Sequence, residues 1–258
     1  MRLARPLGLA ATGLAAGFFS GLFGVGGGVI LVPLLILALG YSQRLASGTS
    51  LAAVLPTVVA GLIGYASSGS VDWIAGGVLG LGAVAGSLLG TWLLHRIPQR
   101  QLRWAFVVFL VAVAIRMFFL VPDRGAELEF GVGALVALLA VGVVVGILSG
   151  LLGIGGGVIV VPVLMLVFGV GDLVAKGTSL LMMIPTSITG TIANATRRNV
   201  DLRAAAVIGL LAIPASFGGV AVAVLIPPAL GSILFALLLV VSAAQLGWNA
   251  WRQRNSAG

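Results

Sequence analysis

The sequence has no cysteine, one histidine and six acidic residues among 258. The absence of cysteine excludes disulfides, thiolate metal sites and thiol redox chemistry. One histidine and six acids are too few for a histidine–carboxylate metal cluster or an acid–base active site, so we expect neither an enzyme nor a metal or cofactor site. Only 8% of the residues are charged and 60% are hydrophobic, whereas a soluble domain has roughly 25% charged residues. A soluble globular protein is therefore excluded.

Long uncharged runs make up most of the chain. No charged residue lies between Arg5 and Arg44, between Glu129 and Asp172, or between Arg203 and Arg252. Each gap exceeds the ~20 apolar residues that span a bilayer as a helix. The runs are continuous, whereas a barrel would show alternating segments of ~10 residues. We therefore expect an all-α polytopic membrane protein. The net charge of +8 then reflects arginines in cytoplasmic loops and does not indicate nucleic acid binding.

The two halves of the chain repeat each other. Residues 21–35 read GLFGVGGGVILVPLL and residues 150–164 read GLLGIGGGVIVVPVL, at an offset of 129. The same offset places Gly48–Ser50 on Gly177–Ser179, both reading Gly-Thr-Ser, and Asp72 on Asp201. So many matched polar and glycine positions indicate a duplication, with repeats at 1–129 and 130–258.

Breaker residues divide each repeat in the same way. Hydropathy and breakers predict a glycine-broken segment followed by three transmembrane helices. These segments are 8–40, 46–66, 73–94 and 103–121 in the first repeat, and 133–170, 174–196, 202–225 and 229–250 in the second. Asp72 and Asp201 each precede an apolar run and are predicted to cap the helices that follow.

The distribution of basic residues predicts the topology. The segment 29–40 is only about 18 Å long as a helix, so we expect a re-entrant hairpin at each broken segment. With the N-terminus inside, this places Arg116, Arg124 and Lys176 outside and the other eleven of the 14 basic residues inside. Each repeat then crosses an odd number of times, which makes the two repeats inverted. We expect a multi-pass protein of the cell (inner) membrane with both termini cytoplasmic. The first apolar run has a counterpart deep in the chain, which argues against a cleaved signal peptide.

The two glycine loops are the main candidate binding site. Gly24–Gly28 and Gly153–Gly157 each precede a short helix, whose first amides are unpaired and whose dipole is positive there. Two such ends facing each other near the midplane form an anion site in inverted-repeat transporters. The alternative is that the glycines only permit close helix packing. The candidate substrate-binding glycines are Gly26, Gly27, Gly28, Gly155, Gly156 and Gly157.

Hydroxyl groups and one lysine complete the candidate site. The side chains of Thr49, Ser50, Thr178 and Ser179 can donate to an anion, or can bond back to the preceding helical turn. Lys176 can attract an anion at the entrance, although snorkelling to the interface is its default interpretation. Because no acid is expected within the membrane, a carboxylate proton relay is not apparent. If protons are coupled to transport, the substrate itself would carry them, through its own protonation and deprotonation.

The repeated motif resembles a known family. The duplicated glycine run that ends in Pro33 or Pro162, followed in both halves by A-x-G-T-S-L, resembles the TauE/SafE family, also called sulfite exporters. The resemblance implies transport of sulfite, sulfoacetate or another organosulfonate, and it marks the glycine loops and Gly-Thr-Ser triplets as the positions to test. Related thiosulfate-uptake proteins are thought to use cysteines, which this chain lacks.

These inferences lead to one function and one alternative. We expect a secondary transporter that exports small sulfur-containing anions by alternating access, with its site at the interface of the repeats. Its expected partners are the anion, the lipid bilayer and protons as a coupling ion, with no nucleic acid and with homo-oligomerisation left open. The alternative is a passive channel for anions or small solutes.

Overall fold

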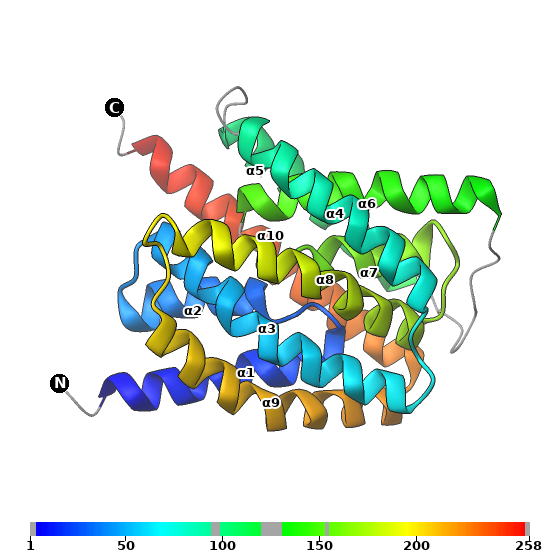
Figure 1. The fold of residues 1–258 in the computed structure, drawn as a ribbon, viewed down its shortest axis with the longest axis horizontal. Helices are drawn as coiled ribbons and strands as arrows, with labels where there is room; N and C mark the ends of the chain where they lie inside the picture. The colour runs from blue at the N-terminus through cyan, green and yellow to red at the C-terminus, as the bar shows by residue number, and fades with distance from the viewer. Residues whose placement is uncertain (1–3, 94–98, 120–130, 153–154, 256–258) are drawn as a thin grey trace.

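Ten helices and no strand make up the described part of the chain in the computed structural model, which covers residues 4–93, 99–119, 131–152 and 155–255. Figure 1 shows the helices stacked side by side with their axes roughly along one direction. They are α1 (Ala4–Phe23), α2 (Gly28–Leu39), α3 (Gln43–Ser67), α4 (Trp73–Leu93), α5 (Gln99–Phe119), α6 (Val132–Leu152), α7 (Gly157–Leu166), α8 (Asp172–Ala195), α9 (Leu202–Leu225) and α10 (Pro228–Asn255).

Caps and glycines determine where these helices begin and end. The Asp72 carboxylate accepts from the Ala75 amide at 2.9 Å, and the Asp201 carboxylate accepts from the Ala204 amide at 3.0 Å. Both predicted caps are therefore confirmed. Ser42 caps α3, which begins at Gln43 and not at the predicted 46. Gly169 has a left-handed φ of +67°, and α7 ends at Leu166, before the predicted 170.

Small residues bring the helices into backbone contact. α1 packs along α9, and α6 packs along α4. A Cβ added to Gly17 would lie 2.6 Å from the Ala212 Cα, and one added to Gly146 would lie 2.8 Å from the Ala83 Cα. Such close approach is how helices associate in a bilayer, where the hydrophobic effect between helices is absent.

Contacts between the two halves occur in matched pairs. A Cβ at Gly48 would overlap the carbonyl oxygen of Asn199, and one at Gly177 would overlap that of Ser70. At the repeat offset of 129 residues, Gly177 is the counterpart of Gly48, and Asn199 is the counterpart of Ser70. Reciprocal contacts of this kind are typical of two like units related by a twofold axis.

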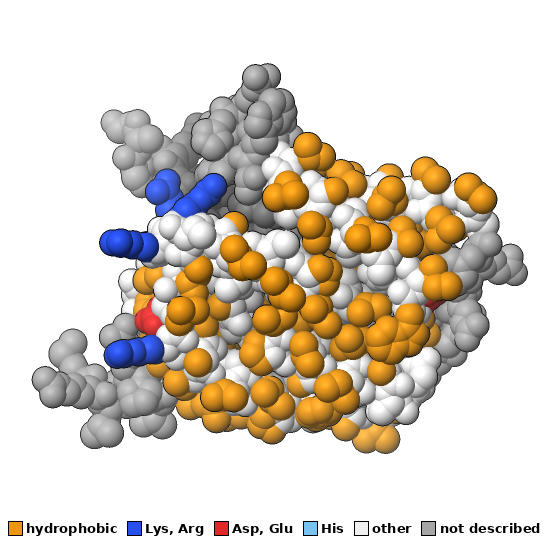
Figure 2. Space-filling model, viewed as in Figure 1, with side chains coloured by type: hydrophobic (Ala, Val, Ile, Leu, Met, Phe, Trp, Pro, Cys, Tyr) orange, Lys and Arg blue, Asp and Glu red, His pale blue; other side chains and the backbone are white. Residues whose placement is uncertain are grey.

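The surface is apolar over most of its area. By length and hydropathy, α3, α6, α9 and α10 each contain a segment that can cross a membrane. Large exposed hydrophobic side chains are spread over the visible face between its ends, while the Lys and Arg side chains seen in this view gather at one end, around the turn between α8 and α9 (Figure 2). An apolar band that is free of charge matches a lipid-facing surface. The prediction of an all-α polytopic membrane protein is confirmed.

Candidate functional site

The two glycine loops meet inside the helix bundle. Gly24, Gly26 and Gly27 have φ values of +68°, +72° and +74°, and Gly155 and Gly156 have +86° and +82°. Only glycine adopts this left-handed backbone without strain. A Cβ at Gly157 would lie 3.0 Å from the Gly24 carbonyl oxygen and 2.9 Å from the Val25 Cα, so the loops touch through their backbones. Gly153 and Ile154 lie outside the described residues.

Backbone amides in both loops lack hydrogen-bond acceptors. Residues 25–29 are buried, and no described residue accepts from the amides of Val25 through Val29. In the second loop, the amides of Gly156 through Val158 also have no described acceptor. The next two amides, of Ile159 and Val160, donate to the Gly156 carbonyl. Nearly all buried amides in proteins are paired. Two groups of amides without described acceptors therefore lie at the positive ends of α2 and α7 and make the region where the loops meet electropositive.

Met183 of α8 fills the space between the loops. Its side chain is fully buried, and its terminal methyl occupies the region that a Cβ at Gly26 or Gly155 would need. Its sulfur lies 2.9 Å from the position of a Cβ at Gly157. A methionine side chain is flexible and apolar, so it can both close a polar site and move out of it. Sequence reasoning missed Met183, because its counterpart in the first repeat is Val54 and one methionine in an apolar helix carries no signal.

The Gly-Thr-Ser triplets join the two halves. The Thr49 hydroxyl accepts from the Asp201 amide at 3.0 Å, and the Thr178 hydroxyl accepts from the Asp72 amide at 3.0 Å. Both threonines are at most 1% exposed. Each triplet therefore fixes the loop that precedes a helix of the other repeat. A role for these hydroxyls in substrate binding stays a prediction.

The two serines of the triplets differ. Ser179 donates to the Gly24 carbonyl at 3.0 Å and so supports the first glycine loop. The Ser50 hydroxyl is buried and has no partner among the described residues. A buried hydroxyl without a partner is costly unless something else bonds to it. Ser50 is thus the triplet side chain that is most available to a ligand.

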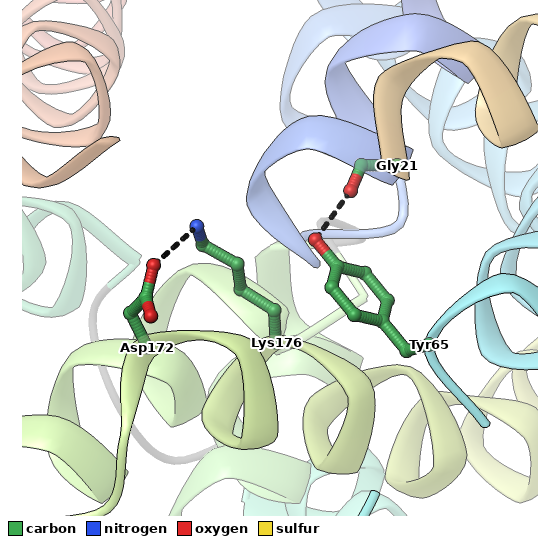
Figure 3. A network of polar contacts seen from close by, with 4 residues as sticks. All are labelled: Gly21, Tyr65, Asp172 and Lys176. Atoms are coloured by element: carbon green, nitrogen blue, oxygen red, sulfur yellow. Dashed lines mark hydrogen bonds and ion pairs between the residues drawn. The ribbon is translucent and has the colours of Figure 1, made fainter. Parts of the chain in front are cut away.

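Lys176 does not reach the interface. The side chain is 3% exposed, and its ammonium lies 3.3 Å from the Asp172 carboxylate, one helical turn earlier (Figure 3). The expectation of snorkelling is therefore wrong, because a buried carboxylate holds the ammonium inside the bundle. Asp172 is the first residue of α8, before the predicted helix 174–196, and it is buried beside this lysine. The spacing of four residues on one helix was the signal that could have found the pair.

Tyr65 of α3 connects this region to the first glycine loop. The ring is fully buried, and its hydroxyl donates to the Gly21 carbonyl of α1 at 2.7 Å, three residues before Gly24 (Figure 3). A Cβ at Gly24 would lie 2.5 Å from the Lys176 Cα, so the loop also rests on the backbone of α8. The glycine loop, the lysine pair and Tyr65 therefore form one packed unit.

Comparison with known proteins agrees with this architecture. The family model described as "Sulfite exporter TauE/SafE" matches residues 1–117 and 138–258. The chain is 28% identical to the probable membrane transporter protein YunE of Bacillus subtilis over 210 residues. This alignment covers 72% of this chain and 77% of YunE. It is 26% identical over 247 residues to the probable membrane transporter protein YjnA of the same organism, covering 91% of this chain and 96% of YjnA.

A third relative is archaeal. A probable membrane transporter protein of Methanocaldococcus jannaschii is 31% identical over 163 residues, which is 59% of this chain and 58% of the relative. The family match extends over both halves and includes both glycine loops and both Gly-Thr-Ser triplets. The chain therefore belongs to the TauE/SafE family and is a multi-pass membrane transport protein.

Proposed function

We propose that this protein is a secondary transporter of small sulfur-containing anions, such as sulfite, sulfoacetate or another organosulfonate, and that it works as an exporter in the cell (inner) membrane. The observation that carries the proposal is the meeting of the two glycine loops, with their buried amides unpaired. An anion must lose its hydration shell on entering a buried site, and this is costly without replacement donors. The amides of two helix N-termini supply such donors without a fixed charge.

Alternating access is supported by the reciprocal packing of the repeats. In Figure 1, α1 begins at the left end of the molecule, near the N-terminus, whereas its counterpart α6 begins at the right end. Opposed directions of this kind are what inverted repeats require, with the substrate site where they meet. α2 and α7 are 12 and 10 residues long, or about 18 and 15 Å, which favours re-entrant hairpins. In such a carrier, Met183 moves aside when the anion enters.

The exposed arginines support cytoplasmic termini. Arg44, Arg197, Arg198 and Arg203 are exposed. The basic side chains visible in Figure 2 lie at the end of the molecule where the described N-terminal helix begins. Basic residues are retained on the cytoplasmic side.

Thr49 and Thr178 hold the loops of the opposite repeat, whereas Ser50 is free to donate to the substrate.

Counterflow in proteoliposomes tests the function. Labelled sulfite and labelled sulfoacetate are offered outside vesicles loaded with the same unlabelled anion, with sulfate as a control solute. We expect accelerated exchange of one of the two sulfur anions. Uncoupled flux without counterflow would instead indicate a channel, and exchange of neither anion by folded protein would overturn the proposal.

A matched pair of double variants locates the site. In Gly26→Ala/Gly155→Ala the added methyl groups enter the space between the loops, where the Met183 methyl lies. In the control, Gly40→Ala/Gly169→Ala, both positions have the same left-handed φ of +67° and no atom within 4 Å of the added Cβ. Backbone strain is therefore similar in the two variants. We expect loss of exchange only in the first, and equal exchange by both would place the site elsewhere.

A further inference from the structure

A narrow pocket beside the first glycine loop contains a buried ion pair. Four helices line it, and its polar members are Asp172 and Lys176 of α8 and Ser232 of α10. The remaining lining residues are Met117, Val161, Met165, Gly231 and Phe235. The pair has no counterpart in the first repeat, because the offset of 129 places Gln43 and Ser47 at the equivalent positions. This pocket therefore breaks the symmetry of the two repeats.

Two polar atoms in the pocket are buried without a partner. The second carboxylate oxygen of Asp172 and the hydroxyl of Ser232 bond to no described residue, and both side chains are at least 95% buried. The position of a Cβ at Gly231, in the first turn of α10, lies 3.6 Å from the Lys176 ammonium and 3.9 Å from the Asp172 carboxylate. The ammonium, the hydroxyl and the positive end of α10 are all suited to an oxyanion.

This pocket adjoins the proposed site through α8. The Lys176 backbone touches Gly24, and Ser179, three residues further along α8, donates to the Gly24 carbonyl at 3.0 Å. The Lys176 ammonium is therefore the described buried cation next to the first glycine loop. Because the ammonium is already paired, an anion must displace the Asp172 carboxylate to bind it.

We propose that the Asp172–Lys176 pair is a second anion site that couples transport to one proton, an inference that rests on the proposed function. The incoming anion replaces the Asp172 carboxylate at the Lys176 ammonium. The released carboxylate is buried and unpaired, and it takes a proton from water on the open side to become a neutral acid. One anion and one proton are thus carried in the same direction, so export requires an outward anion gradient that outweighs the proton gradient. Release of the anion reverses both steps. An unpaired charge buried in a protein is too costly to persist, so the two events are linked.

Among the described residues, few other titratable groups face Asp172 from the surrounding helices. Tyr65 of α3 lies on the far side of Lys176 and donates to the Gly21 carbonyl (Figure 3). On α5, Arg116 is exposed while its neighbour Met117 lines the pocket. The pocket residues from α7 and α10 do not titrate. Asp172 is therefore the carboxylate that we assign to the coupled proton.

The test separates coupling from transport in the same proteoliposomes. Exchange is first measured by counterflow at equal pH, using whichever of labelled sulfite and labelled sulfoacetate the wild-type protein exchanges. Net accumulation is then measured with a pH gradient of one unit. The wild-type protein and Asp172→Asn are compared with the same anion, so the anion's own protonation is identical in both. One coupled proton changes the limiting accumulation ratio by about tenfold per pH unit.

We expect Asp172→Asn to lose the tenfold additional accumulation that the wild-type protein shows, while its counterflow rate changes because the carboxylate no longer competes with the anion for Lys176. Equal accumulation by the two proteins would overturn the inference. A wild-type protein that exchanges neither anion would instead overturn the proposed function, and the inference with it.

A second variant keeps the test valid if Asp172→Asn does not fold. Asp172→Asn/Lys176→Gln removes both charges, and replacing a buried ion pair as a unit is tolerated better than removing one partner. Gel filtration in detergent checks its folding. We expect this variant to lose gradient-driven accumulation. If it accumulates the anion as the wild-type protein does, the pair plays no part in coupling.

Discussion

The hydrogen bond between Thr178 and Asp72 allows a direct measurement of what the Gly-Thr-Ser triplet does. Thr178→Val keeps the shape of the side chain and removes the oxygen that accepts from the Asp72 amide at 3.0 Å. The amide is then left without a partner at the contact between the repeats. Leaving a buried donor unpaired costs about 1–3 kcal/mol. Because Asp72 is only half-buried, we expect a loss near 1 kcal/mol.

The same reasoning applies to the other repeat. Thr49→Val removes the acceptor of the Asp201 amide, and the two bonds share no atom. The double variant is therefore expected to lose roughly 2 kcal/mol, since independent sites add. Reversible unfolding in mixed detergent micelles measures these losses. Thr178→Ser is the control, because it retains the hydroxyl and is expected to be more stable than Thr178→Val.

Transport measurements then separate structure from substrate binding. If the threonine acts only through the Asp72 amide, Thr178→Val that is still folded exchanges anions at close to the wild-type rate. The reasoning is refuted if Thr178→Val is as stable as Thr178→Ser but has lost exchange. In that case the hydroxyl acts on the substrate and not on the contact between repeats.

Three further changes test the packing around the site. Gly177→Ala places a methyl group against the Ser70 carbonyl and is expected to abolish folded protein in a detergent stability assay, whereas Gly77→Ala, with open space around it, is expected to be neutral or slightly stabilising. Met183→Ala removes the side chain between the loops; we expect a stability loss of about 2–5 kcal/mol together with faster exchange of larger sulfonates, and slower exchange would contradict a closing role. Tyr65→Phe removes the donor to the Gly21 carbonyl and is expected to cost about 1 kcal/mol in the same unfolding assay, with no change implying that the bond is not formed.

The helices themselves follow from local sequence. The breakers predict a helix over 202–225, and α9 spans Leu202–Leu225, because Asp201 caps its start. The helix after the second glycine loop is shorter than hydropathy predicts, since Val167, although apolar, lies beyond its last turn. Hydropathy cannot distinguish an apolar helix from an apolar turn, so the end of α7 depends on backbone geometry at Gly169.

The candidate site was only partly accessible from sequence. Glycine loops and triplets repeat at one offset, so they stand out without a structure. The pairing of Thr49 with Asp201 joins two motifs that were each recognised separately but not connected. Met183 and Asp172 were missed, because neither repeats in the other half. A symmetry argument finds only what both halves share.

The sequence by itself determined the class of the protein, its duplication and the number of long apolar segments in each half. These properties depend on composition and on breakers that act within a few residues. Only the tertiary structure decided which face of each helix meets a neighbour. A membrane helix is apolar all round, so its sequence shows no buried side. Small residues and backbone contacts decide which face is buried. Three features of the site depend on this: Lys176 faces Asp172, Met183 lies between the loops, and both threonines bond to the opposite repeat.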